Sequence, residues 1–406
     1  MFKEKEITDS IKTETKVPLG FRAGGIHCGI KRSRKDLALI ISDFPAAAAA
    51  VFTLNKVQAA PVLVSKMVLT NSRFHKAIIV NSGNANACTG DSGYDDAIKM
   101  INETAAELGV DANEIFVAST GVIGEPLPIE KIISGIHSVN SVLSGRDFTS
   151  AAEAIMTTDT FTKAVSSTFQ IDGEEVTIYG MAKGSGMIHP NMATMLGFVL
   201  TDAAIDKDVF QTLLKETTEK TFNRIIVDGD TSTNDMVIAL ANGASGASII
   251  PQTKSYRIFE EELYNILKKL SIDIVRDGEG ATKLIGITIE GAKTDEDAVK
   301  AARTIALSPL VKTAIHGEDA NWGRIIAAVG YSGIEFDPAK FEIIINCIQI
   351  LNQNYSVSLS NAEANQSLKS QNIYMLIRLN GGNGTATCWT CDLSEEYVKI
   401  NGSYRS

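Results

Sequence analysis

The chain has 406 residues, of which 44% are hydrophobic and 21% charged, and its formal net charge is −10. This composition is typical of a globular protein with about two or three domains and a substantial core. Acidic and basic residues are interspersed along the sequence, so it lacks the clustered positive charge needed to bind nucleic acid or an anionic membrane. We expect neither partner.

Three features of the sequence bear on the cellular compartment. The N-terminal segment is polar and carries no apolar signal-peptide core. No segment approaches the roughly 20 apolar residues of a membrane helix. The 5 cysteines are an odd number in a large chain, which fits a reducing compartment better than a disulfide framework. We therefore expect a cytoplasmic protein.

In chain order, the first distinctive element is the basic run at residues 31–35 (KRSRK), which is followed directly by Asp36 and which we interpret as a solvated turn. The predicted strands are short, rich in Val and Ile, and bounded by Gly, Asn or Asp. They cover residues 77–80, 115–118, 176–181, 197–200, 224–227, 284–289, 341–350 and 373–379.

Amphipathic patterns predict helices between these strands. One helix is expected to begin at Asp96 and another at Asp206. A third apolar stripe runs through residues 259–274. In a fourth helix, Thr294 and Asp297 form a variant of the capping box.

The predicted strands and helices mix without a strict βαβ rhythm, which favours layered α+β sheets over a doubly wound fold. We predict an α-β-β-α sandwich-like main domain over residues 1–291. A smaller C-terminal α/β domain is predicted over residues 292–406.

The segment richest in candidate chemistry covers residues 183–196 (KGSGMIHPNMATML). A predicted strand runs into a Gly-Ser-Gly turn and then a His-Pro-Asn turn, where the backbone can bend tightly or be approached closely. Thr194 follows, just before the next predicted strand. A hydroxyl in this position is a candidate nucleophile.

A threonine hydroxyl needs a base within hydrogen-bond reach to act as a nucleophile. Cleavage of the peptide before Thr194 would supply one, because the new α-amino group has a pKa of roughly 7.7–8.0. The same hydroxyl could perform the cleavage by attacking the Ala193 carbonyl. Taken alone, the pattern fits a structural role as well, in which Thr194 caps a turn and its apolar neighbours lie in the core.

Residues 183–196 resemble the cleavage-site signature of the ornithine acetyltransferase (glutamate N-acetyltransferase) family of arginine biosynthesis. Further segments similar to that family are found at residues 81–90 (NSGNANACTG), 119–124 (STGVIG), 157–160 (TTDT), 228–235 (DGDTSTND), 276–283 (RDGEGATK), 317–324 (GEDANWGR) and 397–406 (YVKINGSYRS). The resemblance therefore extends over essentially the whole chain.

The resemblance implies a precursor that cuts itself between Ala193 and Thr194. The α chain would comprise residues 1–193 and the β chain residues 194–406, and the two would assemble as an α2β2 heterotetramer. Thr194 would take the acetyl group from N-acetylornithine and pass it to glutamate. Many members of the family also accept acetyl-CoA as the donor, and the implied mechanism requires no cofactor and no metal.

Two positions match the oxyanion hole of the family, Thr120 and Gly121. They follow a predicted strand in a Gly-rich turn, where backbone N–H groups can point at a ligand and stabilise a tetrahedral oxyanion. Without the resemblance, the same residues would be an ordinary strand-ending turn.

The substrate-binding positions implied by the resemblance are Thr157, Lys183, Thr194, Glu279, Asn401 and Ser406. An ammonium at Lys183 could pair with the substrate carboxylate, and the carboxylate of Glu279 could hold the side-chain ammonium of ornithine. Read from the residues alone, Lys183 would be a surface charge and Glu279 a polar loop residue. The family commonly ends in Thr, but the hydroxyl is retained in Ser406.

Two other patterns do not support a site. Cys388 and Cys391 have redox spacing, yet they lie in a predicted strand without an adjoining helix, so we interpret them as core or edge cysteines. His189, His316 and Glu318 lack the spacing of metal ligands.

Two alternative functions remain open. A self-processing N-terminal-nucleophile amidohydrolase or aminopeptidase would use the same cleavage, with water in place of an amine resolving the acyl-enzyme. A non-catalytic relative would fold without cleavage and serve as a binding or assembly subunit.

Overall fold

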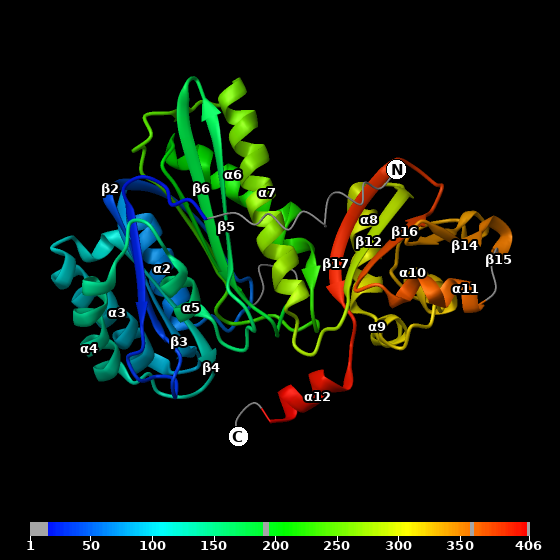
Figure 1. The fold of residues 1–406 in the computed structure, drawn as a ribbon, viewed down its shortest axis with the longest axis horizontal. Coiled ribbons are helices and arrows are strands. Elements are labelled where there is room, and N and C mark those ends of the chain that lie inside the picture. The colour runs from blue at the N-terminus through cyan, green and yellow to red at the C-terminus, as the bar shows by residue number, and fades with distance from the viewer. Residues whose placement is uncertain (1–14, 190–194, 358–360, 404–406) are drawn as a thin grey trace.

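The computed structural model describes residues 15–189, 195–357 and 361–403 (Figure 1). They form two large β-sheets with helices on their faces and a small two-stranded sheet, and the long helix α7 (Lys254–Arg276) lies between the two large sheets. The predicted layered α+β class is therefore confirmed. The predicted division at residue 291 stays a prediction.

The larger sheet has eight strands within the described residues, in the order β4-β3-β2-β10-β7-β6-β5, with β1 paired to β2. The β3–β4 and β7–β10 pairs are parallel, and the other neighbours are antiparallel. The strands are β1 (Phe21–Ile26), β2 (Leu37–Phe52), β3 (His75–Asn84), β4 (Ile115–Val122), β5 (Lys163–Ile171), β6 (Glu174–Lys183), β7 (Leu196–Thr201) and β10 (Met236–Ala241).

Strand β2 divides this sheet into two arms. Its first half pairs with β1 and β3, its second half pairs with β10, and its register shifts between Ile41 and Ala46. Apolar side chains from both arms, including Ile40 on β2 and Tyr179 on β6, share one core. The two arms thus form the pair of β layers that the sandwich prediction requires.

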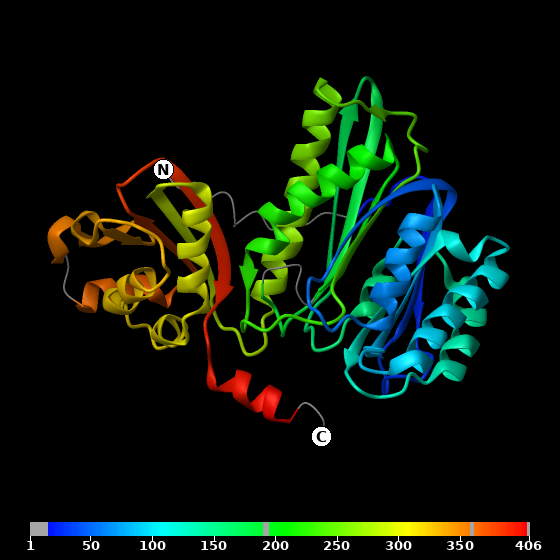
Figure 2. The ribbon, with the colours of Figure 1, turned by 180° about the vertical axis from the view of Figure 1, so that it is seen from behind.

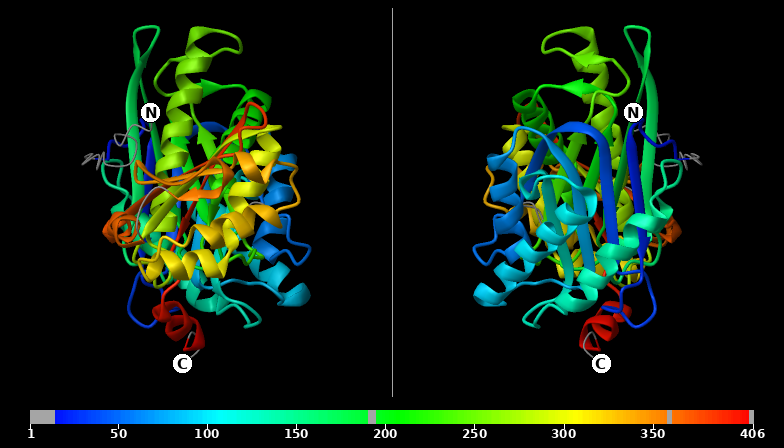
Figure 3. Two further views of the ribbon diagram at one scale, coloured as in Figure 1. Left: turned by 90° about the vertical axis from the view of Figure 1, so that its right-hand side faces the viewer. Right: turned by 90° about the vertical axis from the view of Figure 1, so that its left-hand side faces the viewer.

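Helices cover both outer faces of the larger sheet (Figures 1 and 3). One set packs on the β1–β4 arm, and α6 and α7 pack on β2, β5 and β6. The helices are α2 (Ala60–Asn71), α3 (Gly90–Leu108), α4 (Ile129–Val139), α5 (Thr149–Ile155) and α6 (Lys207–Lys220). In β6, Tyr179 and Met181 face the shared core whereas Ile178 and Ala182 face α6 and α7. A strand covered on both faces is apolar throughout.

The smaller sheet has seven strands within the described residues, in the order β15-β14-β13-β16-β12-β17-β9. These are β9 (Ile225–Ile226), β12 (Leu284–Ala292), β13 (Glu342–Ile345), β14 (Ile348–Asn352), β15 (Ser356–Val357), β16 (Asn372–Arg378) and β17 (Gly384–Cys391). Its helices are α8 (Asp295–Leu307), α9 (Pro309–His316), α10 (Trp322–Gly330) and α11 (Asn361–Gln366). A separate two-stranded sheet joins β8 (Ala204–Ile205) to β11 (Ser248–Ile249).

Apolar packing joins the two sheets through α7. Leu284, Trp389 and Cys391 of the smaller sheet belong to the same core as α6 and α7. Cys388, three residues from Cys391 on β17, faces the opposite core. Residues three apart in a strand point to opposite faces, and both thiols are free. The prediction of core cysteines is confirmed.

The last helix, α12 (Glu395–Gly402), stands apart from the helices of the smaller sheet in Figures 1 and 2. Among the described helices, none combines the length and the apolar character needed to cross a bilayer.

Most predicted elements are confirmed, and three were wrong in extent. The strand expected at 224–227 is only the two-residue β9, because Arg224 ends a 3-10 helix. The strand expected at 341–350 is a hairpin, because Asn346 and Cys347 both adopt positive φ, at 47° and 66°, and form the turn between β13 and β14. Helix α3 begins at Gly90 and not at Asp96. Its first turn contains Gly93, which packs tightly on Asn86 in the preceding loop. The helix therefore begins where it contacts that loop, and not at the first residue of its apolar stripe.

Candidate active site

The loop predicted to carry the chemistry leaves the sheet at Lys183 and returns at Leu196. These residues end β6 and begin β7, and they are cross-strand partners. The loop is therefore closed at its base, with its two ends side by side. It contains Ala193 and Thr194, which lie outside the described residues, so the cleavage bond and the nucleophile remain predictions.

Hydrogen bonds hold the first half of this loop against two other segments. The Gly184 N–H donates to Asp159 Oδ1 at 2.7 Å, and the hydroxyls of Ser185 and Thr158 lie 2.6 Å apart. The Ser185 carbonyl accepts from the Glu279 N–H at 2.8 Å. The TTDT and GEG motifs thus both contact the loop.

The chain is also fixed nearer to the predicted cleavage bond, on both sides. Asp228 accepts hydrogen bonds from the N–H groups of Met187 at 2.6 Å and Ile188 at 2.8 Å. These bonds hold Met187 at a φ of 57°, a conformation that is costly for a residue with a side chain. Beyond the bond, the Met195 carbonyl accepts from the Met236 N–H at 3.2 Å.

Thr120, one of the two predicted oxyanion residues, contacts Lys183. The Lys183 ammonium donates to Thr120 Oγ1 at 3.2 Å, and both side chains are buried. Thr120 lies near the end of β4 and Lys183 ends β6, so the two arms of the larger sheet bring them together.

Gly121, the other predicted oxyanion residue, occupies a position that no other residue fits. Its φ is 135°, and a Cβ atom there would stand 2.3 Å from the Gly83 carbonyl carbon. The β3–β4 register shifts beside it, between Gly83 and Asn84. The pairing of β3 and β4 therefore becomes irregular directly after the Gly83–Gly121 pair.

Asn234 joins the two arms next to this turn. Its side-chain amide donates to the carbonyls of Ala85 at 2.6 Å and Ser119 at 2.9 Å. The Ser119 hydroxyl in turn donates to Asn81 Oδ1 at 2.5 Å. All these side chains are buried, so the backbone around Thr120 is firmly positioned.

Lys183 is a buried lysine, and lysine side chains are rarely buried in proteins. Burial lowers the pKa of its ammonium, while the carboxylates of Asp159, Asp235 and Glu279 favour the charged form and the Lys163 ammonium opposes it. A buried cation of this kind is stabilised by an anionic ligand. The site can therefore receive a carboxylate beside Thr120.

A buried ion network underlies the site. Lys163 Nζ lies 2.7 Å from Asp159 Oδ1 and 2.5 Å from Asp277 Oδ2. Asp159 Oδ2 also accepts from the Thr157 N–H at 2.8 Å. Burial pushes the pKa of Asp159 upward, but the Lys183 and Lys163 ammoniums outweigh burial and bring it down to about 2. The sequence offered no signal for this network, because its members come from separate elements.

Glu279 and Asn401, two predicted substrate contacts, lie together at a second edge of the site. Asn401 Nδ2 donates to Glu279 Oε2 at 2.9 Å. The Glu279 carboxylate also packs on Gly186, where a Cβ would stand 2.4 Å from its carboxyl carbon. The glycine in the loop therefore makes room for this carboxylate. Ser406, another predicted contact, lies outside the described residues.

The turn that carries Glu279 is tied to the start of α12. The Ser394 hydroxyl donates to the Gly280 carbonyl at 2.6 Å. Gly280 has a φ of 71°, and a Cβ on it would stand 2.5 Å from the Tyr397 nitrogen. This contact fixes the start of α12 beside the turn, and Asn401 on α12 reaches the Glu279 side chain.

Thr157 lies next to the basic run at residues 31–35. Its carbonyl accepts a hydrogen bond from the Arg34 guanidinium, and the Met156 carbonyl accepts one from the Lys31 ammonium. The interpretation of this run as a solvated turn was wrong for Lys31, which is half-buried. Sequence reasoning missed both cations because their contacts lie more than a hundred residues away.

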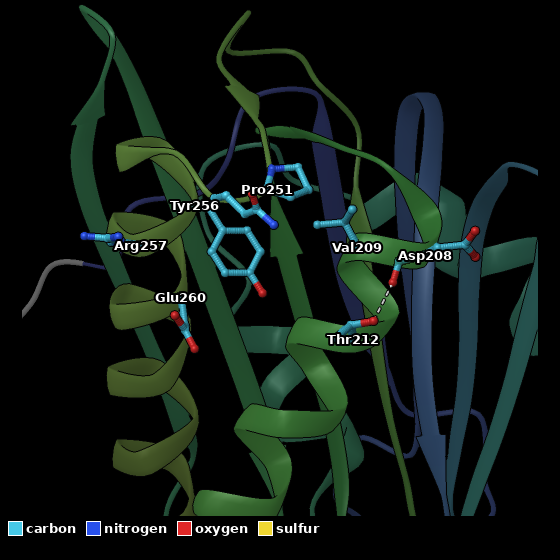
Figure 4. Close-up of a pocket in the computed structure, with 8 residues that line it drawn as sticks. Asp208, Val209, Thr212, Pro251, Tyr256, Arg257 and Glu260 are labelled. Atoms are coloured by element: carbon cyan, nitrogen blue, oxygen red, sulfur yellow. Dashed lines mark hydrogen bonds between the residues drawn. The ribbon is translucent and has the colours of Figure 1, made fainter.

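An open groove of about 550 Å³ lies elsewhere, between the N-terminal parts of α6 and α7 (Figure 4). It is lined by Asp208, Val209, Thr212, Pro251, Gln252, Tyr256, Arg257 and Glu260. None of the predicted site residues lines it. Within the described residues, no group of three or more His, Cys, Asp or Glu side chains could hold a metal ion.

Comparison with known proteins gives a consistent result. The model of the ArgJ family matches residues 22–406. The arginine biosynthesis bifunctional protein ArgJ of Symbiobacterium thermophilum is 49% identical over 96% of this chain and 98% of its own length. The crystal structure of the Bacillus halodurans protein of the same name is 45% identical, covers 52% of this chain and 100% of that chain, and has a TM-score of 0.50. The ornithine acetyltransferase of Mycobacterium tuberculosis, crystallised with ornithine, is 38% identical over 44% of this chain and 97% of that chain, with a TM-score of 0.39.

Proposed function

The chain belongs to the ArgJ family of arginine biosynthesis enzymes, and we propose that it transfers the acetyl group of N-acetylornithine to glutamate through acetylated Thr194. The observation that carries this proposal is the contact between Lys183 and Thr120 at the base of the loop that contains Thr194. It places a cation for the substrate carboxylate beside the residues that would stabilise an oxyanion.

The first step is self-cleavage. The Thr194 hydroxyl attacks the Ala193 carbonyl, the peptide becomes an ester, and water opens the ester to leave a free α-amine on Thr194. Asp228 supports this step because it holds the strained turn before the bond, while Met195 is fixed after it.

The acetyl transfer follows in two half-reactions. The Thr194 hydroxyl gives its proton to its own α-amine and attacks the acetyl carbonyl of N-acetylornithine. The tetrahedral oxyanion is stabilised at Thr120 and Gly121, where each such hydrogen bond is worth roughly 3 kcal/mol. Collapse expels ornithine, whose amine takes the proton. The amine of glutamate then attacks the acetyl ester and releases acetylglutamate.

The remaining residues bind the substrate. Lys183 pairs with the α-carboxylate, and the carboxylate of Glu279, held by Asn401, receives the side-chain ammonium of ornithine. Thr157 and Ser406 complete the contacts. Acetyl-CoA could serve as a second donor without any change in these roles.

The cleaved protein would consist of chains 1–193 and 194–406 in an α2β2 heterotetramer in the cytoplasm. One observation supports the division: the solved Bacillus halodurans chain is matched over 100% of its length yet covers 52% of this chain. A chain of that size is what cleavage near the middle would produce.

Two measurements test the proposal. Denaturing mass spectrometry should give two chains of nearly equal size for the wild type, one uncut chain for Thr194→Ala, and partial cleavage for Thr194→Ser. With N-acetylornithine and glutamate, ornithine and acetylglutamate should form in equal amounts. Free acetate without acetylglutamate would instead identify an amidohydrolase, and acetyl transfer by Thr194→Ala would refute the mechanism.

A further inference from the structure

The proposed reaction poses a problem of charge. The side chain of the donor, N-acetylornithine, ends in an ammonium, whereas the side chain of the acceptor, glutamate, ends in a carboxylate. Glu279 suits the first and repels the second. If one site serves both half-reactions, it needs a separate cation for the acceptor's side chain.

The loop that carries Lys31 is rigidly built. Asp36 is fully buried, and its carboxylate accepts hydrogen bonds from the N–H groups of Cys28 at 2.6 Å, Ile30 at 2.8 Å and Lys31 at 2.9 Å. These bonds hold the pKa of Asp36 below its usual value although burial opposes them. The backbone of Lys31 is thus fixed by a buried anion.

The side chain of Lys31 lies beside the predicted oxyanion turn. Its Cγ stands 3.1 Å from where a Cβ on Gly83 would be, and Gly83 is the cross-strand partner of Gly121. Its ammonium donates to the carbonyls of Lys35 at 2.8 Å and of Met156. The cation is therefore held between the oxyanion turn and the segment that carries the next predicted substrate contact.

Arg34 lies next to it, with its guanidinium on the Thr157 carbonyl. Both cations contact carbonyl oxygens, and within the described part of the chain neither forms an ion pair with a carboxylate. Their neighbour Lys35, in contrast, pairs with Glu153 at 2.5 Å. A guanidinium and an ammonium side by side, each without an anionic partner, suit a carboxylate ligand.

We propose that Lys31 and Arg34 bind the side-chain carboxylate of the glutamate acceptor and so determine which amino acid receives the acetyl group. Glu279 and Asn401 then serve the ornithine side chain in the same site. This inference rests on the proposed acetyl transfer.

The electrostatics of Lys31 agree with this role. Burial and the positive charges of Arg34 and Lys183 lower its pKa to about 8, against the opposing effect of Asp36 and Asp159. A carboxylate bound next to the Lys31 ammonium would raise this pKa again. A bound carboxylate would therefore stabilise the charged form of Lys31.

The test compares two acceptors of equal size, glutamate and its neutral isostere glutamine, with N-acetylornithine as the donor and the self-processed enzyme. Lys31→Met and Arg34→Gln should each lower kcat/KM for glutamate by about tenfold or more and leave that for glutamine within about twofold. The burst of ornithine release should be unchanged. Arg32→Gln is the matched control, because Arg32, like Arg34, is an exposed cation of the same loop.

Several results would overturn the inference. They are a parallel fall of kcat/KM for glutamate and glutamine, and a control that loses as much as the variants. A loss seen only when acetyl-CoA replaces N-acetylornithine would also overturn it and would identify a phosphate site. Lys31→Arg should restore the preference for glutamate if charge is the cause. If the wild type forms acetylglutamate and every variant keeps its ratio of kcat/KM for glutamate to that for glutamine, this inference alone is refuted. If the wild type forms no acetylglutamate, the proposed function is refuted as well.

Discussion

Asp159→Asn should destabilise the protein far more than the loss of a surface charge would. Asp159 is 3% exposed, and its two oxygens accept hydrogen bonds from Lys163 Nζ at 2.7 Å, Gly184 N–H at 2.7 Å and Thr157 N–H at 2.8 Å. An asparagine offers one acceptor oxygen and turns its NH2 group toward at least one of these donors.

The magnitude follows from two contributions. A pKa of about 2 in place of 3.8 corresponds to roughly 2–3 kcal/mol of stability at neutral pH. An unsatisfied buried donor costs roughly 1–3 kcal/mol more. We therefore expect a loss of roughly 3–5 kcal/mol, the range for breaking a buried ion pair. Because the folded pKa is depressed, the carboxylate's contribution is fully present above pH 3.8 and is lost as the pH falls toward about 2.

Urea unfolding followed by circular dichroism measures this effect at neutral pH. Asp43→Asn is the control, because Asp43 pairs with Arg22 at 2.8 Å with both side chains more than 40% exposed. Such a surface pair is worth about 0–1 kcal/mol. A loss for Asp159→Asn no larger than that of the control would refute the reasoning from the buried network.

Three more predictions concern the site itself. Lys183→Ala should raise KM for N-acetylornithine about 10- to 100-fold, and it should also lower the free energy of unfolding, because Asp159 loses the Lys183 charge that helps to depress its pKa; an unchanged KM would contradict the binding role. Gly121→Ala should cost roughly 2–4 kcal/mol in thermal unfolding because its Cβ would meet Gly83, whereas Gly124→Ala, at a φ of 82° in open space, should cost about 1 kcal/mol. The preference for glutamate over glutamine should decline in the wild type as the pH rises above about 8, where Lys31 loses its charge. It should persist at that pH in Lys31→Arg. Equal pH profiles in the wild type and Lys31→Arg would exclude Lys31 as the group that binds the glutamate side chain.

Local signals in the sequence predicted local structure well. Asp206 accepts hydrogen bonds from Asp208 N and Val209 N at the start of α6. Thr294 accepts from Asp297 N at the start of α8, as the capping pattern indicates. Such caps depend on residues within one turn of a helix, so the sequence contains all the information they need.

Elements stabilised by distant partners were harder to predict. The run of alanines from Ala46 to Ala50 carries no strong strand propensity. It nevertheless lies in β2, because Ala46 pairs with His75 of β3 and β10 pairs with β2 from Ala47 to Phe52. The same limit applies to Lys163, whose two carboxylate partners are 4 and 114 residues away. A lysine in a strand gives no sign of which acids it will meet after folding.

The candidate site depends on the same long-range geometry. The bend in β2 sets the two arms face to face, so that the end of β4 meets the end of β6 and Lys183 reaches Thr120. Asn234 closes this junction by bonding to backbone from the first arm. The motifs predicted which residues belong to the site. The contacts between these residues depend on the strand topology, which the motifs do not contain. Replacing the buried alanines of β2 with larger side chains should therefore distort the strand and separate Thr120 and Gly121 from Lys183, while each motif remains intact.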